Sequence, residues 1–360
     1  MKKYNIIISG GGTGGHLFPA LAIAEELKLR FKGIKILFVG SSGRIEMTKV
    51  PAAGYNIIGL WIDGFQRNFS LKNLLFPIKL FFSLIKSLFI LMINKPIIVV
   101  GTGGYASGPL IFVANLLKIP SLIQEQNSYP GITNKMLARS VDKIAVAYDG
   151  LEQYFPEEKI VVTGNPIRKS IETCSFDALK AKKHFELNLD KQTLVVLGGS
   201  LGAKGINNLI AEKLDWFISH DIQIIWQCGS LYYDKYKELS CDEVKVLAFV
   251  NEMDQLYASA DFIISRAGAA TLSELSFVAK PAILIPSPNV AENHQFHNAM
   301  AFANRNAAIV VTEKNLNTEF EESFMTLLDQ EIQKEFIHNL RQFAKPDAAK
   351  EIVNHIEEFL

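Results

Sequence analysis

The sequence predicts an α/β protein made of two doubly wound parallel-sheet domains in tandem. Three observations support this fold class. Short, continuously apolar runs alternate with helical patterns along the chain, as they do in sheets buried on both faces. One such run leads into a glycine loop at 10–15, and a later run leads into another at 198–205. The 360 residues are also enough for two domains, each of about 150 residues.

The first half begins with a strand-like run at 4–9, which ends in the first glycine loop. A helical pattern with apolar residues from Leu17 to Leu27 follows at once. Further strands are predicted at the ranges 35–39, 97–100, 121–123 and 143–147. A second glycine stretch at 101–108 follows one of them. This alternation of strands and helices indicates a parallel sheet.

The pattern restarts after Gly164-Asn165-Pro166 with a strand-like run and the glycine loop at 198–205. Strands are predicted at the ranges 193–197, 223–226, 245–248, 262–265 and 282–285. We therefore expect domains at 1–164 and 165–345. The helical stretch 346–360 is expected to pack back on the first domain. In such tandem sheets, ligands bind at the carboxyl ends of the strands, where both glycine loops fall.

Composition limits the functional classes. The chain carries 37 Lys and Arg against 37 Asp and Glu, a net charge of zero. This balance argues against a protein that coats nucleic acid, because phosphate neutralisation needs an excess of basic residues. Cys174, Cys228 and Cys241 are scattered, with no CxxC pair, which favours a reduced, cytoplasmic compartment over a disulfide scaffold.

One apolar segment is long enough to suggest a membrane span, because 15 of the 20 residues from Leu74 to Ile93 are apolar. Lys79 and Lys86 lie inside it, and Pro77 lies near its start. Each lysine is costly at a bilayer centre, so an amphipathic surface element is predicted instead. With Lys72 these lysines recur every seven residues, which places them along one helix face.

This segment belongs to the range 64–124, which contains six basic residues and no acidic residue. Two interpretations remain open. The apolar residues can be ordinary core with a solvated rim of lysines. Alternatively, the segment can form a basic, apolar patch that rests on an anionic membrane surface.

The glycine loops predict binding of a phosphate group by backbone amides at a helix start. Gly10, Gly12 and Gly15 match the dinucleotide pattern GxGxxG, but no acidic residue ends the second strand and Glu46 lies too far on. A nucleotide sugar fits better. No Asp-x-Asp pair exists to hold Mg²⁺ on a diphosphate. Neither a metal nor a cofactor is therefore expected.

The second half offers the groups that such a ligand needs. Arg168 lies beside the domain boundary, and Ser200 is followed by a predicted helix start. The run 265–274 combines a strand end, a glycine turn and a helix start that carries Glu274. This glutamate can accept hydrogen bonds from ribose hydroxyls, or it can be a capping acid in the first helical turn.

Taken together, these residues resemble the MurG family, the N-acetylglucosaminyltransferases that complete the lipid-linked disaccharide of peptidoglycan. The resemblance covers nearly the whole chain. It rests on motif blocks at 11–19, 103–109, 125–127 with 133–135, 164–168, 198–203, 265–274, and 293–295 with 298–299. Departures from the family pattern are small. The family often has a residue other than alanine at the position of Ala270, and the range 286–292 matches the family pattern only loosely.

The resemblance implies a GT-B fold, in which two Rossmann-like domains face a cleft. It implies an inverting transfer of N-acetylglucosamine from UDP-N-acetylglucosamine to the 4-hydroxyl of undecaprenyl-diphospho-N-acetylmuramoyl-pentapeptide. A peripheral position on the cytoplasmic face of the inner membrane is also implied. The implied donor contacts are Thr13, Gly14, Gly15, Asn127, Arg168, Ser200, Val250, Ala269, Ala270, Thr271, Leu272, Ser273, Glu274 and Gln295.

An inverting displacement needs a base for the acceptor hydroxyl. His16 is the first candidate, because imidazole titrates near neutrality, and Glu125 is the reserve. His16 can instead contact phosphate or shape the loop. Ser200 and the helix expected to start there would stabilise the diphosphate. Alternative functions are a UDP-N-acetylglucosamine 2-epimerase, a lipid-A disaccharide synthase, and a non-catalytic membrane-peripheral module that holds a phosphorylated lipid.

Overall fold

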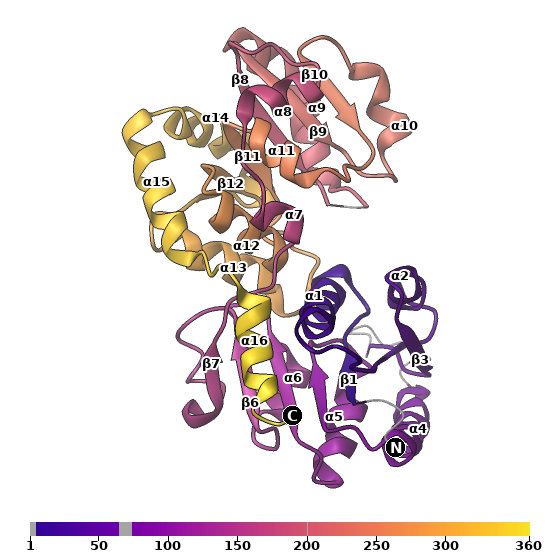
Figure 1. The fold of residues 1–360 in the computed structure, drawn as a ribbon. Coiled ribbons are helices and arrows are strands. Elements are labelled where there is room, and N and C mark those ends of the chain that lie inside the picture. The colour runs from indigo at the N-terminus through magenta and orange to yellow at the C-terminus, as the bar shows by residue number, and fades with distance from the viewer. Residues whose placement is uncertain (1–4, 65–73, 200) are drawn as a thin grey trace. The chain divides into compact units, whose positions relative to one another are not determined.

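The computed structural model describes residues 5–64, 74–199 and 201–360. These residues form two compact α/β units, which are taken one at a time below (Figure 1). Unit 1 comprises 1–167 with 345–360, and unit 2 comprises 168–344. The C-terminal helix α16 (Ala348–Glu357) thus belongs to unit 1, where it packs against α1 (Gly14–Arg30).

The described part of unit 1 contains a parallel sheet with the strand order β3-β2-β1-β4-β5-β6-β7. Its strands are β1 (Ile6–Ser9), β2 (Ile36–Ser41), β3 (Asn56–Leu60), β4 (Ile98–Gly101), β5 (Ser121–Glu125), β6 (Lys143–Val146) and β7 (Ile160–Val162). Its remaining helices are α2 (Glu46–Ala52), α4 (Phe76–Asn94), α5 (Ser107–Leu116), α6 (Ile132–Leu137) and the short η1 (Glu157–Lys159).

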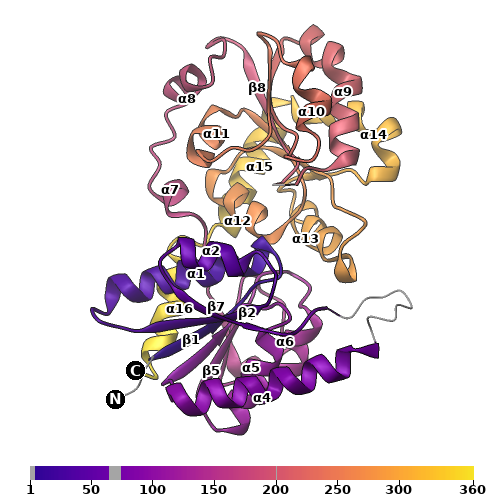
Figure 2. The same cartoon turned by 90° about the vertical axis from the view of Figure 1, so that its right-hand side faces the viewer.

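Strand β1 shows why the sheet is covered on both faces. Ile6 and Ile8 pack into one core with α1 and α16, whereas Ile7 packs into another with α4 and α5. Successive strand side chains point to opposite faces, so a fully apolar strand requires two apolar layers. Figure 2 shows these helices on either side of the sheet.

Unit 2 repeats the design with the strand order β10-β9-β8-β11-β12-β13 among its described residues. Its strands are β8 (Gln192–Leu197), β9 (Ile222–Gln227), β10 (Val244–Leu247), β11 (Phe262–Ser265), β12 (Ala282–Leu284) and β13 (Ile309–Val310). Its helices are α7 (Lys169–Glu172), α8 (Ala178–His184), α9 (Lys204–Ser219), α10 (Tyr233–Tyr236), α11 (Met253–Ser259), α12 (Ala269–Val278), α13 (His294–Ala303), α14 (Leu316–Leu327) and α15 (Gln330–Phe343), with short η2 (Lys237–Leu239), η3 (Ala291–Asn293) and η4 (Glu313–Asn315).

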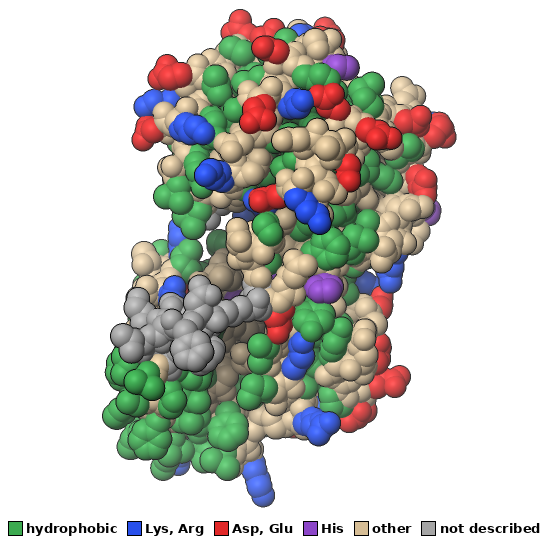
Figure 3. Space-filling model, turned by 180° about the vertical axis from the view of Figure 1, so that it is seen from behind, with side chains coloured by type: hydrophobic (Ala, Val, Ile, Leu, Met, Phe, Trp, Pro, Cys, Tyr) green, Lys and Arg blue, Asp and Glu red, His purple; other side chains and the backbone are tan. Residues whose placement is uncertain are grey.

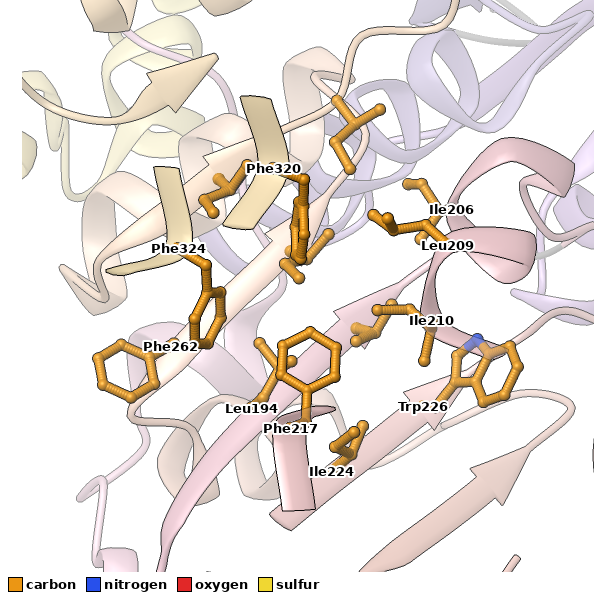
Figure 4. Packing of buried hydrophobic residues seen from close by; sticks show 14 of the residues in the cluster. Leu194, Ile206, Leu209, Ile210, Phe217, Ile224, Trp226, Phe262, Phe320 and Phe324 are labelled. Atoms are coloured by element: carbon orange, nitrogen blue, oxygen red, sulfur yellow. The ribbon is translucent and has the colours of Figure 1, made fainter. Parts of the chain in front are cut away.

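The core of unit 2 is rich in aromatic side chains (Figure 4). Phe217 from α9 lies against Phe320 and Phe324 from α14, with ring centroids 6.0 and 5.1 Å apart in edge-on geometry. Edge-to-face pairs of this kind add to the stabilisation that area burial provides. The strand order, 3-2-1-4-5-6 when counted from β8, is that of a Rossmann sheet.

These two parallel sheets confirm the predicted fold class. The strands that the sequence pattern did not reveal are β3, β7 and β13, and all three lie at sheet edges. An edge strand is partly exposed, so its apolar run is short and weak. The helix expected at Ser200 begins instead at Lys204. Gly199 and Gly202 have φ of +79° and +89°, so these two residues are themselves outside helical geometry.

Candidate functional site

The first glycine loop of unit 1 follows β1 at the carboxyl edge of the sheet. Gly12 has φ +82°, which reverses the chain before α1 begins at Gly14. Thr13 is the N-cap residue, but its side chain does not cap the helix. The first turn of α1 contains no acidic side chain, and Thr13 and Gly15 are exposed. The positive end of the helix is therefore presented to solvent.

A buried carboxylate anchors this loop. Glu46 at the start of α2 is fully buried, and its Oε2 accepts the Gly12 N–H at 2.8 Å while Oε1 accepts the Ser41 N–H at 2.9 Å. A Cβ atom on Gly11 would lie 2.2 Å from Glu46 Cδ, so glycine is required there. The sequence pattern excluded Glu46 as a ribose ligand, and the structure places it under the loop as a support.

His16 lies in the first turn of α1, against the second glycine stretch. Its Nδ1 is 3.2 Å from the Gly11 carbonyl oxygen and 3.3 Å from Thr13 Oγ1. A Cβ atom on Gly103, which has φ +93°, would come within 2.8 Å of the imidazole. When Nδ1 carries the proton and donates it to Gly11, Nε2 is the nitrogen that can accept a proton.

Glu125, at the end of β5, is only 2% exposed and is saturated with donors. Its Oε1 accepts the backbone and side-chain N–H groups of Asn127, both at 3.0 Å. Its Oε2 accepts the Gly131 N–H at 3.1 Å and Asn134 Nδ2–H at 2.8 Å. Each oxygen already accepts two hydrogen bonds, which uses the capacity of a carboxylate. These four hydrogen bonds make Glu125 an anchor for the loop, and its role as the reserve base stays a prediction.

In unit 2, three elements bring a cation, a hydroxyl and a carboxylate together. Arg168 is the N-cap of α7, Tyr257 lies in α11 and Glu274 lies in α12, and α7 packs against both of the other helices. Arg168 Nε is 3.3 Å from Glu274 Oε1. The Tyr257 hydroxyl donates to Glu274 Oε2 at 2.8 Å. Glu274 is the sixth residue of α12 and is buried, so it is not a first-turn capping acid.

Burial dominates the electrostatics of this cluster. Desolvation raises the pKa of Glu274, although the Arg168 charge and the Tyr257 hydrogen bond act in the opposite direction. The pKa of Tyr257 is raised well above its usual value, first by burial and then by the Glu274 charge. Tyr257 is therefore a neutral donor throughout the physiological range. Sequence reasoning missed it, because a tyrosine within an apolar helix carries no distinctive pattern.

The other residues of unit 2 that were predicted to contact the nucleotide-sugar donor lie as follows. Ala269 to Ser273 form the first turn of α12, which contains no acidic side chain. Gln295 lies on α13, where its Oε1 accepts the Ser287 N–H at 2.9 Å. Val250 is buried after β10, and Ser200 lies outside the described residues. In the described parts of the chain, no group of three or more His, Cys, Asp or Glu could hold a metal ion.

The outer face of α4 is apolar, and Figure 3 shows the resulting hydrophobic area on unit 1. We call this surface the α4 patch: it consists of Ile78, Phe81, Phe82, Ile85 and Phe89, which are 36–59% exposed. By length and composition alone α4 could cross a membrane. Its opposite side, however, contributes Leu80, Leu84 and Leu88 to the core over α5.

The predicted lysine row is only partly available for contacts outside the protein. Lys79 Nζ is 2.5 Å from Asp63 Oδ2, and Arg44 lies 3.5 Å from the same carboxylate. The hydrogen bond from Lys79 lowers the pKa of Asp63, with both cations contributing. Lys86 donates to the Gly59 carbonyl oxygen at 2.7 Å and remains exposed. Lys72 lies outside the described residues.

Comparison with known proteins places these features in a family. Residues 6–146 match the glycosyltransferase family 28 N-terminal domain, and residues 193–359 match its C-terminal domain. The UDP-N-acetylglucosamine--N-acetylmuramyl-(pentapeptide) pyrophosphoryl-undecaprenol N-acetylglucosamine transferase of Flavobacterium psychrophilum is 52% identical, over 99% of this chain and 98% of that protein. The enzyme of the same name from Christiangramia forsetii is 49% identical, over 99% and 97%.

Among solved structures, MurG of Acinetobacter baumannii has a TM-score of 0.79 and 28% identity, and the match covers 99% of both chains. The two sheets, the glycine loops and these matches agree along the full length. The chain belongs to glycosyltransferase family 28 and, within it, to the MurG family.

Proposed function

We propose that this protein transfers N-acetylglucosamine from UDP-N-acetylglucosamine to the 4-hydroxyl of N-acetylmuramoyl-pentapeptide carried on undecaprenyl diphosphate. This is the activity that the names of its relatives describe. The observation that carries the proposal is the cluster of Arg168, Tyr257 and Glu274 beside the first turn of α12. It offers a carboxylate for ribose hydroxyls next to a helix start for a diphosphate.

The donor is held mainly by unit 2. Glu274 accepts hydrogen bonds from the ribose hydroxyls, and the amides at the start of α12 face the diphosphate. Negative charge that develops on the leaving UDP is stabilised by this helix end, by the loop around Gly199 and Gly202, and by Arg168. Gln295 contributes through its side-chain amide to the recognition of the sugar.

His16 acts as the base for the acceptor hydroxyl. Its Nδ1 contact with the Gly11 carbonyl fixes the ring, and Nε2 removes the proton as the hydroxyl attacks the anomeric carbon from the face opposite UDP. Glu46 supports this arrangement because it holds Gly12, the residue after Gly11. Thr13, Gly14, Gly15 and Asn127 are further donor contacts from unit 1, as the family resemblance implies.

No tightly bound divalent metal takes part in this scheme, because the chain has no Asp-x-Asp pair and relies on helix ends. Turnover by metal-stripped enzyme in excess chelator is the direct check. Activity should persist there. Loss of turnover that added Mg²⁺ restores would contradict the metal-free scheme.

The acceptor's lipid tail stays in the bilayer, so the enzyme must approach the membrane. The α4 patch is the surface that we propose for docking on the inner leaflet, because apolar side chains can enter the interface there. Replacing Phe81 and Phe82 with Ser should weaken binding to anionic vesicles. A matched control is Leu231→Ser with Phe249→Ser, two exposed apolar residues of unit 2. Equal binding by both double variants would exclude the α4 patch as the docking surface.

One assay separates the proposed reaction from the alternatives. Purified protein is mixed with UDP-N-acetylglucosamine, with and without a lipid-linked muramoyl acceptor, and free UDP and both sugars are measured. A transferase of the proposed kind releases UDP only with this acceptor. A 2-epimerase changes the donor sugar without it, a lipid-A disaccharide synthase requires a different acceptor, and a non-catalytic module releases nothing.

A further inference from the structure

We infer that Tyr257 is a positioning residue that sets the selectivity of the donor site for ribose over a sugar that lacks the 2′- and 3′-hydroxyls. This inference rests on the proposed function, in which Glu274 accepts those hydroxyls. Tyr257 acts through Glu274 and needs no contact with the donor. Three features of the cluster support this role: its unfilled hydrogen-bonding capacity, the burial of both side chains, and its electrostatics.

The first feature is the number of donors around the carboxylate. Among the residues that the structure describes, Glu274 has one partner on each oxygen, Arg168 Nε on Oε1 and the Tyr257 hydroxyl on Oε2. A carboxylate can accept about four hydrogen bonds. These two contacts therefore leave capacity for two more donors, which matches the two hydroxyls of a ribose. Glu125, by contrast, has its full set of four supplied by the protein.

The second feature is burial. Tyr257 is completely buried, so water cannot take the place of its hydroxyl against Glu274 Oε2, whereas Glu274 itself remains 5% exposed. Arg168 is different, because its side chain is 41% exposed and can exchange its contact for water. The Tyr257 hydroxyl is thus the more rigid of the two partners. It fixes the plane of the carboxylate, and the plane determines where two ribose hydroxyls can be accepted.

The third feature is charge. Burial raises the pKa of Glu274, and the Tyr257 hydrogen bond is one of the two influences that oppose this rise. Only the ionised carboxylate can accept from both hydroxyls with both oxygens, because a protonated carboxyl uses one oxygen as a donor. Removing the Tyr257 hydroxyl therefore frees the carboxylate of Glu274 to change its orientation, and it shifts Glu274 toward its protonated form. Both effects act only on ligands that carry ribose hydroxyls.

The test is Tyr257→Phe, which keeps the buried ring and removes only the oxygen. Affinities for UDP and for 2′,3′-dideoxy-UDP are measured by calorimetry. We expect UDP to bind on the order of 10-fold more weakly, as expected when a hydrogen bond to a charged group is lost. Binding of 2′,3′-dideoxy-UDP should stay unchanged. The matched control is Tyr236→Phe, another buried tyrosine of unit 2, whose hydroxyl donates to Asn208 at 2.8 Å.

Two further measurements distinguish failure of the inference from failure of the proposed function. Glu274→Ala should also weaken UDP selectively; equal losses for both ligands would refute the ribose role itself. If Glu274→Ala is selective but Tyr257→Phe affects both ligands equally or neither, Tyr257 has no positioning role. The pH dependence gives a second readout, because UDP affinity should begin to fall at a higher pH in Tyr257→Phe than in wild type. An unchanged midpoint would overturn the inference.

Discussion

Two buried carboxylates, Glu125 in unit 1 and Glu274 in unit 2, differ in how their oxygens are used. Glu125 accepts four N–H groups from neutral donors of its own unit. Glu274 faces one hydroxyl and one partly exposed cation. Both are almost fully buried, and desolvation raises the pKa of Glu274. The comparison separates a carboxylate that shapes a loop from one that can receive a ligand.

Glu46 extends this comparison. Its two oxygens accept backbone N–H groups from Gly12 and Ser41, so it also serves the protein's own loops. The buried carboxylates that surround the loops of unit 1 are therefore structural. In the proposed scheme proton transfer falls to His16, which lies beside the first glycine loop. The predictions below test this division of roles, beginning with the largest expected effect.

If Glu125 is only an anchor, His16 must be the base, and His16→Ala should lower kcat by about 10²- to 10⁴-fold. Donor affinity should change much less, because a base acts in the transition state. Steady-state kinetics with both substrates measures kcat and the KM for the donor. His220→Ala, an exposed histidine of unit 2, is the control. Near-normal turnover of His16→Ala, or a defect confined to UDP binding, would leave His16 with a loop-shaping role.

The anchor itself is tested by stability. Glu125→Ala removes the acceptor of four N–H groups, of which that of Asn134 is buried and those of Asn127 and Gly131 are partly buried. A buried donor that loses its acceptor costs about 1–3 kcal/mol before relaxation. We expect the free energy of unfolding to fall by about 3 kcal/mol or more, measured by urea denaturation with a fluorescence readout. Glu274→Ala should lower the free energy of unfolding by less, because the partly exposed Arg168 side chain can be hydrated instead. Equal destabilisation by the two substitutions would remove the distinction between the carboxylates.

The ligand-receiving carboxylate is tested by affinity. Glu274→Ala removes the acceptor for two ribose hydroxyls, so UDP should bind about 10- to 100-fold more weakly. The KM for UDP-N-acetylglucosamine should rise in parallel. Calorimetry with UDP checks the first expectation, and Glu26→Ala, a glutamate that pairs with Arg30 in unit 1, is the control. Unchanged UDP affinity would show that Glu274 does not hold the donor.

These carboxylates also mark the limit of what sequence patterns predict. The fold class followed from continuous apolar strands and glycine loops, and Glu274 stood out because it follows a strand end and a glycine turn. The roles of Glu46 and Tyr257 did not follow, because each depends on contacts between residues 17 or 34 positions apart. The edge strands β3, β7 and β13 were not predicted for another reason, because partial exposure shortens their apolar runs.

The raised pKa of Glu274 predicts the direction in which UDP affinity changes with pH. If ribose hydroxyls donate to the ionised form, as proposed, bound UDP lowers the pKa that burial raises. By linkage, UDP affinity falls as pH drops through the raised pKa of the free protein, by at most about 10-fold per pH unit. Titration of UDP affinity against pH should show this fall in wild type and not in Glu274→Gln. The same profile in both proteins would assign the fall to another group.

The smallest expected effect concerns the lysines beside the α4 patch. Like the two carboxylates, they differ in whether the protein itself supplies a partner for the charge. Lys79 shares Asp63 with Arg44, so removing Lys79 together with Asp63 leaves the local net charge unchanged. Within the described part of the chain, Lys86 contacts only a neutral carbonyl, so its charge is not compensated there. Each basic residue near an anionic surface contributes about 1 kcal/mol, and salt screens this contribution. Lys86→Gln should therefore weaken binding to anionic vesicles by about five-fold at low salt. The pair Lys79→Gln with Asp63→Asn should bind like wild type, and a loss equal to that of Lys86→Gln would show that Lys79 faces the lipid.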